Sequence, residues 1–367
     1  MYLDNNATTA LDPRVFKAML QDLSGPPANP SSIHWFGRQA HHLLRTARQT
    51  VAAYFQVKPE EIIFTSGGTE SINLFLRGLG TKGHLITTSI EHSSIYRTVQ
   101  ALESQGLSVT YLPVGLWGAP LPEHCRAAIR PDTRAIVLTA ANAETGVKID
   151  LEGFASLAHS HHIPLCIDAV AWMGKEPFPM HPGISALTLS GHKFHAPKGI
   201  GALFLRAPLQ LIPTITGGAQ ESKRRAGTEN LSGILGLAAA IDILAQEQTS
   251  ITEHLLQLRL HLEHGLKKAI PDLAINGEGP RIANTVNCLF PGIDGETFLI
   301  QLDMAGIAVS LGSACTTGAM EPSRVLTQMG VSRKLACTSL RFSLSRINTR
   351  EEIDQAIAII AKLYQQK

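Results

Sequence analysis

The chain has few cysteines and no motif that pairs them. Its 367 residues contain five cysteines, which lie far apart and form neither a CxxC pair nor a dense framework. The start of the sequence has neither a basic region nor an apolar core, so a secretion signal is not expected. These absences argue against a disulfide scaffold and against a structural zinc site. We therefore expect an unexported, cytoplasmic protein.

Long apolar runs and runs of basic residues are also missing. No stretch approaches the roughly 18 apolar residues of a membrane span, and no Lys/Arg cluster suggests binding to a phosphate backbone. The 32 basic and 30 acidic residues nearly cancel. We thus expect neither a membrane segment nor a nucleic-acid partner. Charged residues make up 17% of the chain against about 25% in typical proteins, so we expect an oligomer that hides part of its surface.

The order of apolar runs predicts the architecture, and the length is sufficient for two domains. From about residue 35 to 250, short β-rich runs alternate with helical patterns, which is typical of a parallel sheet between helices. Strands are expected at 61–66, 84–89, 107–113, 134–141, 164–168, 184–190 and 200–206. Beyond residue 250 we expect a long helical segment, strands at 282–290 and 339–345, and helices at 297–304 and from 350.

These patterns predict an α/β fold with a mostly parallel seven-stranded sheet covered by helices, and a smaller α+β domain. The large domain would span residues 15–250. The small domain would consist of residues 1–14 and 251–367. Ligands of such sheets bind at the carboxyl ends of the strands, so the chemistry of the protein is expected there.

Two of the expected strands end in residues that can carry chemistry. Lys193 stands just past one strand, beside Ser190 and His192. A lysine in this position can condense with an aldehyde cofactor, and the neighbouring hydroxyl and imidazole can hold a phosphate. A solvated loop lysine is the alternative. Asp168 ends another strand and can either pair with a pyridinium nitrogen or cap a helix.

Two glycine-rich segments have different contexts. Residues 65–70 include Gly68 and Thr69 and join a strand to a helical pattern. The amides at such a helix N-terminus can bind an anion, although a simple tight connection is the alternative. Residues 78–83 match GxGxxG but precede a strand. We interpret them as a plain loop rather than a dinucleotide motif.

The histidine cluster His159, His161 and His162 is interpreted as a solvated helix end. No acidic or cysteine partner stands at a metal-binding spacing from it, so we predict no metal site. Cys315 lies in a loop of small residues, where a thiol is either an accessible nucleophile or unreactive. Cys166 lies inside an apolar strand and is interpreted as structural.

Blocks of residues in a fixed order connect these observations: 2–9, 29–34, 65–70, 91–92, 190–193, 197–201, 225–228, 312–315 and 341–346. Together they resemble the cysteine desulfurases of the nitrogen-fixation and iron-sulfur-assembly type. These are fold-type I pyridoxal-phosphate enzymes related to class V aminotransferases. The resemblance covers nearly the whole chain. It implies an enzyme that takes sulfur from L-cysteine, leaves L-alanine, and works as a homodimer with pyridoxal 5′-phosphate.

The resemblance also implies how the cofactor is held. Lys193 would carry it as an imine, Asp168 would keep the ring nitrogen protonated, and His92 would stack on the ring and assist proton transfer. The residues that would hold the phosphate are Gly68, Thr69, Ser190 and His192, with Thr228 reaching across from the second subunit.

The same resemblance assigns the substrate and sulfur chemistry. Arg341 would bind the substrate carboxylate through two parallel charge-assisted bonds. Asn29 and His34 would line the same pocket. The Cys315 thiolate would attack the substrate sulfur and keep it as a persulfide. That sulfur would then pass to a scaffold or carrier protein in iron-sulfur cluster assembly.

Two positions depart from the family's pattern. Ala143 stands where the family usually has Asn, and Ala171 where it usually has Gln. Both missing side chains would bond near the cofactor's phenolic oxygen, and losing such a bond costs about 1.5 to 3 kcal/mol. Slower chemistry or a changed substrate, as in a selenocysteine lyase or an aminotransferase, is one alternative. A non-catalytic cofactor-binding assembly subunit is the other. An aminotransferase would need no nucleophilic thiol, so Cys315 argues against it.

Overall fold

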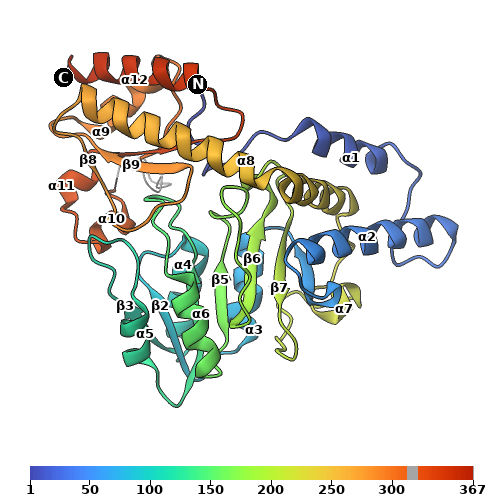
Figure 1. The fold of residues 1–367 in the computed structure, drawn as a ribbon. Helices are drawn as coiled ribbons and strands as arrows, with labels where there is room; N and C mark the ends of the chain where they lie inside the picture. Colours follow the sequence, from blue (N-terminus) through green and yellow to red (C-terminus); the bar gives the residue numbers. More distant parts are fainter. Residues whose placement is uncertain (312–320, 367) are drawn as a thin grey trace.

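A seven-stranded sheet forms the centre of the larger part of the molecule (Figure 1). The computed structural model describes residues 1–311 and 321–366. The strand order is β1-β7-β6-β5-β4-β2-β3. The strands are β1 (Ile62–Thr65), β2 (His84–Thr88), β3 (Ser108–Leu112), β4 (Thr133–Thr139), β5 (Leu165–Asp168), β6 (Ile184–Ser190) and β7 (Gly201–Leu205). Only β7 runs antiparallel to its neighbours. The predicted mostly parallel sheet is therefore confirmed.

Alternate residues of the strands enter two separate apolar cores, one on each face of the sheet. On β5, Leu165 and Ile167 belong to one core and Cys166 to the other. This alternation follows from the two-residue period of a strand, and burial on both faces explains the continuous apolar runs. The covering helices are α2 (Trp35–Tyr54), α3 (Gly68–Gly78), α4 (Ser93–Glu103), α5 (Pro122–Ala128) and α6 (Leu151–Ser160). Cys166 is fully buried, as its structural interpretation requires.

A single 39-residue helix, α8 (Leu231–Ala269), extends from the large sheet to the smaller part of the molecule (Figure 1). It packs against α1 (Pro13–Leu23) and α2 at one end and against α12 (Arg350–Tyr364) at the other. The helix runs without a break through residue 250. The domain boundary that we predict at residue 250 falls inside this one continuous helix, which both parts of the molecule share.

The smaller part is built on a three-stranded antiparallel sheet, β10-β9-β8. Asp4 bridges to Ser343 beside this sheet, and Tyr2 bridges to Ala308. The elements are β8 (Ala274–Ile275), β9 (Thr285–Leu289), α9 (Gly295–Met304), α10 (Arg324–Gln328), α11 (Arg333–Ala336) and β10 (Ser339–Ser343). The α+β character that we expected for this region is thus found, with the start of the chain added to its sheet.

The remaining short elements lie in connections: η1 (Pro59–Glu61), η2 (Gly191–Lys193) and α7 (Gln220–Lys223). The predicted plain loop at 78–83 separates α3 from β2. Within residues 1–311 and 321–366, none of the helices has the length and apolar character that crossing a bilayer requires.

Candidate active site

A cavity of about 300 Å³ opens where the carboxyl ends of β4, β5 and β6 meet the start of the chain and β10. Residues far apart in the sequence line it together. Those that the sequence analysis selected are Gly68, Thr69, His92, Asp168, Ser190, His192, Lys193 and Arg341. Most of the selected residues therefore lie around one cavity, as expected from the position of that cavity at the strand ends.

Lys193 ends the η2 turn that follows β6. Its Nζ donates to the carbonyl oxygen of Ala7 at 3.1 Å and to that of Asn6. Burial and the nearby Arg341 guanidinium lower the pKa of Lys193 to about 8, although Asp168 and Asp4 oppose the shift. Part of the lysine population is therefore neutral close to physiological pH, and a neutral amine is the form that adds to a carbonyl carbon.

Asp168 is the last residue of β5 and is almost fully buried. Its Oδ1 accepts hydrogen bonds from the Val170 amide at 2.9 Å and from Thr188 Oγ1 at 3.3 Å. Burial raises the pKa of Asp168, while His92 and Lys193 oppose the shift. Oδ2 accepts no hydrogen bond from the described residues. This oxygen is free to accept an N–H from a group in the cavity.

His92 stands at the N-cap of α4, with its ring at the cavity. Its Nδ1 accepts from the Ser94 amide at 3.1 Å and lies 2.8 Å from Ser94 Oγ. Because Nδ1 is an acceptor, the proton of a neutral ring is on Nε2. Removal from water lowers the pKa of His92, Lys193 and Arg324 lower it further, and Asp168 opposes them. The ring is therefore a neutral donor near pH 7.

The N-terminus of α3 forms an anion-binding cup beside these residues. Gly68 and Thr69 begin the helix, and Ser190 and His192 face the same cup. The first amides of a helix have no partner within it. The hydroxyls of Thr69 and Ser190 also form no hydrogen bond within the described residues. A Cβ on Gly68 would lie 2.7 Å from Val170 Cγ2, so glycine permits the close approach of α3 to the end of β5.

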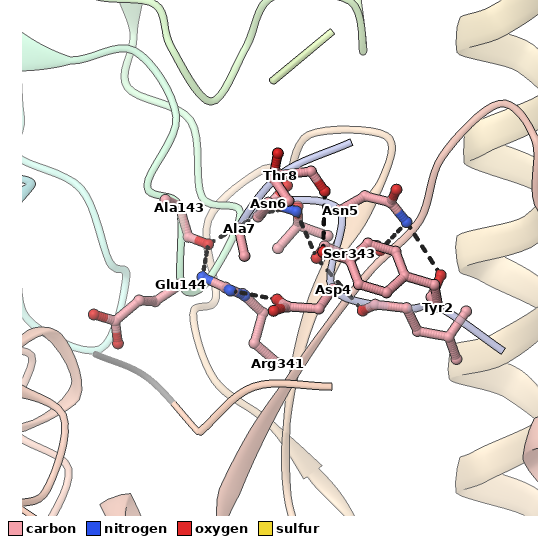
Figure 2. Close-up of polar contacts among 12 residues, drawn as sticks. Tyr2, Asp4, Asn5, Asn6, Ala7, Thr8, Ala143, Glu144, Arg341 and Ser343 are labelled. Atoms are coloured by element: carbon pink, nitrogen blue, oxygen red, sulfur yellow. Dashed lines mark hydrogen bonds and ion pairs between the residues drawn. The ribbon is translucent and has the colours of Figure 1, made fainter. Parts of the chain in front are cut away.

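Arg341 projects from β10 toward the start of the chain (Figure 2). Its Nη2 pairs with Asp4 Oδ1 at 2.6 Å, and its Nη1 donates to the Ala143 carbonyl at 3.1 Å. Its Nε is buried and has no partner among the described residues. A buried donor without a partner is costly. The Arg341 side chain also lines the cavity, where its positive charge would attract a carboxylate.

Three of the selected residues that the structure describes are not found at this cavity. Asn29, His34 and Thr228 are exposed and do not line it. Asn29 Oδ1 accepts from the Ser31 amide, and His34 caps α2. Cys315 lies outside the described residues. A single chain thus does not bring Asn29, His34 and Thr228 to the other site residues.

The two alanines that depart from the family's pattern both line the cavity. The main chain of Ala143 has a structural role, because its carbonyl accepts from Asn6 Nδ2 at 3.0 Å and from Arg341 (Figure 2). Ala171 is largely buried. The histidines His159 and His161 are exposed at the end of α6, as expected for a solvated helix end.

The sequence analysis missed several residues of the site. Asp4 and Asn6 come from the start of the chain, where the block 2–9 contributed to the resemblance but gave neither residue a role at the site. Glu91 is fully buried, and its carboxylate accepts from Thr88 Oγ1 at 2.7 Å and from the Thr139 amide at 2.8 Å. Burial raises the pKa of Glu91 to about 7. In the sequence it was marked only as a member of the block 91–92, without a role of its own.

Comparisons with known proteins agree with this geometry. Residues 1–356 match the model of the family described as Aminotransferase class-V. A protein of Methanosarcina thermophila named cysteine desulfurase IscS is 42% identical over all of this chain and 92% of its own length. A solved structure named NifS-like protein superposes with a TM-score of 0.92, at 34% identity over the full length of both chains. A structure described as SspA in complex with cysteine has a TM-score of 0.82 at 32% identity, covering 95% of this chain and 99% of its own.

Proposed function

Because the chain belongs to the class-V aminotransferase family and to the cysteine desulfurases within it, we propose that it removes sulfur from L-cysteine with pyridoxal 5′-phosphate held in the cavity at Lys193. One observation carries the proposal. The amine of Lys193, the free Oδ2 of Asp168 and the anion cup of α3 line the same cavity.

The hydrogen-bonding groups around the cavity fit the phosphate and the ring nitrogen of this cofactor. Thr69, Ser190 and the first amides of α3 offer unused donors to a phosphate. The His192 ring faces the same cup, with its Nδ1 bonded to Thr8 Oγ1 at 3.1 Å. Asp168 offers an unused acceptor to a pyridinium N–H. When bound, the cofactor supplies an aldehyde to the lysine and a ring that accepts electron density from the substrate.

Four side chains of the protein would bind the substrate carboxylate, transfer protons and keep the bound ring protonated. The Arg341 guanidinium, which lines the cavity, would bind the substrate carboxylate. The Lys193 amine would carry protons to and from the substrate, since its lowered pKa suits it to both directions. His92 would donate from Nε2 as a neutral ring. The Asp168 carboxylate would keep the bound ring protonated.

Cys315 would accept the sulfur. In this step the sulfur leaves the β-carbon of cysteine and bonds to the Cys315 thiolate, and a proton takes its place on that carbon. L-cysteine and one thiol thus become L-alanine and one persulfide. The persulfide would then be passed to a scaffold or carrier protein of iron-sulfur cluster assembly.

A homodimer would complete the site. Asn29, His34 and Thr228 are exposed in the single chain, where a partner subunit could bring them to the cavity. Exposed apolar side chains near them support such an interface: Phe16, Leu20, Leu23, Ile33 and Trp35. Burial of so many large apolar groups against a second copy is the expected use of this surface. We place the dimer in the cytoplasm, since sulfur transfer to a carrier needs free thiols.

The decisive experiment combines product analysis with trapping of the cofactor. Purified protein given L-cysteine and a reductant should release sulfide and alanine in equal amounts. Borohydride treatment should fix the cofactor on the Lys193 peptide, and Lys193→Ala should lose both the fixed cofactor and the activity. Lys17, which is exposed on α1, gives the matched control Lys17→Ala, which should behave as the wild type. An undiminished adduct in Lys193→Ala would overturn the proposal.

A further inference from the structure

A carboxylate lines the anion-binding cup at the N-terminus of α3. Glu70 is the third residue of this helix and borders the cup together with Thr69 and Ser190. Its Oε2 accepts a hydrogen bond from the Ser66 amide at 2.7 Å. The positive end of a helix attracts a carboxylate and a phosphate alike. A negative side chain at this place therefore disfavours a phosphate in the cup unless its charge is neutralised.

Arg225 provides that neutralisation from a distant part of the chain. It lies between α7 and α8, and its Nε donates to Glu70 Oε1 at 2.8 Å while its Nη2 donates to Glu70 Oε2 at 3.4 Å. The exposed fractions of the two side chains are 22% for Arg225 and 13% for Glu70. Burial raises the pKa of Glu70, but the hydrogen bonds with Arg225 and Ser66 lower it by more. The carboxylate is therefore ionised and is held by two partners.

The other charged groups near the cup do not replace Arg225. Lys198 lines the cup but is exposed, so water and salt weaken its field. Glu221 and Glu229 also favour the charged form of Arg225, although Glu221 has its own cation in Arg48, at 2.7 Å. Within residues 1–311 and 321–366, Arg225 is the only cation at ion-pair distance from Glu70. Loss of Arg225 would thus leave a partly buried negative charge that borders the cup.

We propose that Arg225 is a positioning residue that makes the cup receptive to the phosphate of the cofactor, because it neutralises Glu70 and holds its carboxylate beside the Ser66 amide. The proposal rests on the proposed function, in which this cup binds that phosphate. The ring and the aldehyde of the cofactor would bind elsewhere, at Asp168 and Lys193. The effect of Arg225 should therefore depend on the phosphate group, whereas an ion pair that only stabilised the fold would affect ligands with and without a phosphate equally.

The test compares pyridoxal 5′-phosphate with pyridoxal, which lacks the phosphate. Bound aldehyde is removed from the full-length chain with hydroxylamine, and the dissociation constant of each ligand is measured by equilibrium dialysis. Arg225→Met should raise the dissociation constant of pyridoxal 5′-phosphate about tenfold or more, and that of pyridoxal less than about twofold. In Glu70→Gln/Arg225→Met, where neither charge remains, the affinity for pyridoxal 5′-phosphate should return to within about threefold of the wild type.

Two further variants serve as controls. Arg225→Lys keeps the positive charge but loses the forked hydrogen bonding, so it should bind pyridoxal 5′-phosphate better than Arg225→Met does. Arg77→Met removes an exposed arginine from the last turn of the same helix. It should leave both dissociation constants unchanged.

An unchanged affinity in Arg225→Met, or an equal weakening of both ligands, would overturn the proposal. A double variant that binds pyridoxal 5′-phosphate as poorly as Arg225→Met would also overturn it, because the charge of Glu70 would then not be the cause. If Arg225→Met fails to fold, as seen by circular dichroism, the double variant decides alone, and a loss of about tenfold in its affinity would refute the proposal. Wild-type protein that binds pyridoxal 5′-phosphate no better than pyridoxal would instead contradict the proposed function, which is a distinct result.

Discussion

Arg341 offers the sharpest test of how the substrate is recognised. Two of its donors are already engaged, with Asp4 and with the Ala143 carbonyl, and only Nε is buried without a partner. A guanidinium has five N–H donors, so a substrate carboxylate in the cavity that Arg341 lines gains at least one charge-assisted bond at no cost to existing ones. Such a bond contributes about 1.5 to 3 kcal/mol, so its loss should reduce kcat/KM for L-cysteine about 10-fold to 150-fold.

The variant must not leave Asp4 as a partly buried carboxylate without its cation. We therefore compare Arg341→Met in an Asp4→Asn background with Asp4→Asn alone, and check by thermal unfolding that both are folded. Sulfide release gives kcat/KM for L-cysteine. Cysteamine has the amine and thiol of cysteine but no carboxylate, so its inhibition constant should be the same in both proteins. A loss below threefold for L-cysteine, or an equal weakening of cysteamine, would refute the assignment of Arg341.

Three further outcomes are expected. Cys315→Ala should bind the cofactor and L-cysteine normally but release sulfide only at background rate, whereas Cys166→Ala should remain active; wild-type release by the Cys315 variant would point to another nucleophile. Ala143→Asn combined with Ala171→Gln should shift the visible absorbance titration of the bound cofactor to lower pH and raise turnover; no change in either would mean that the site is built around the alanines. Burial raises the pKa of Glu91 to about 7, so the folded protein favours the neutral carboxyl group. The free energy of unfolding should therefore fall as the pH rises through 7 and the group ionises. Glu91→Gln should remove this loss, which reaches about 3 kcal/mol at high pH; urea unfolding at pH 5 and 8.5 checks this, and an equal difference from wild type at both pH values would contradict it.

The sheet could be predicted because its signal is local. Except for the partly exposed edge strand β3, the strands are buried on both faces. All seven strands were found within two residues of their observed ends. Elements without a clear apolar run were missed. The two-residue strand β8 is too short to carry a pattern. Helix α1 was missed although Asp12 caps it and Pro13 begins it.

The site could be predicted only in part. Lys193, Asp168 and Thr69 follow strands, and the topology of a parallel sheet brings strand ends together. Lys175, which also lines the cavity, looks like an ordinary charged residue in the sequence, and Glu91 is marked only as a member of the block 91–92. Their importance comes from burial, which depends on tertiary packing and has no local signature.

The pairing of the start of the chain with β10 has a consequence for synthesis in the cell. Asn5 Nδ2 donates to the carbonyl oxygen of Ser343, which lies 338 positions later in the chain. Asn6 and Ala7 from the same segment contact Lys193. While the ribosome builds the chain, this early segment must wait for a strand that emerges about half a minute later at 5 to 20 residues per second. During that interval the large sheet can fold, but the cavity lacks one wall. Cofactor capture should therefore be a late event that follows synthesis of β10, and nascent chains stalled before residue 339 should bind pyridoxal 5′-phosphate poorly.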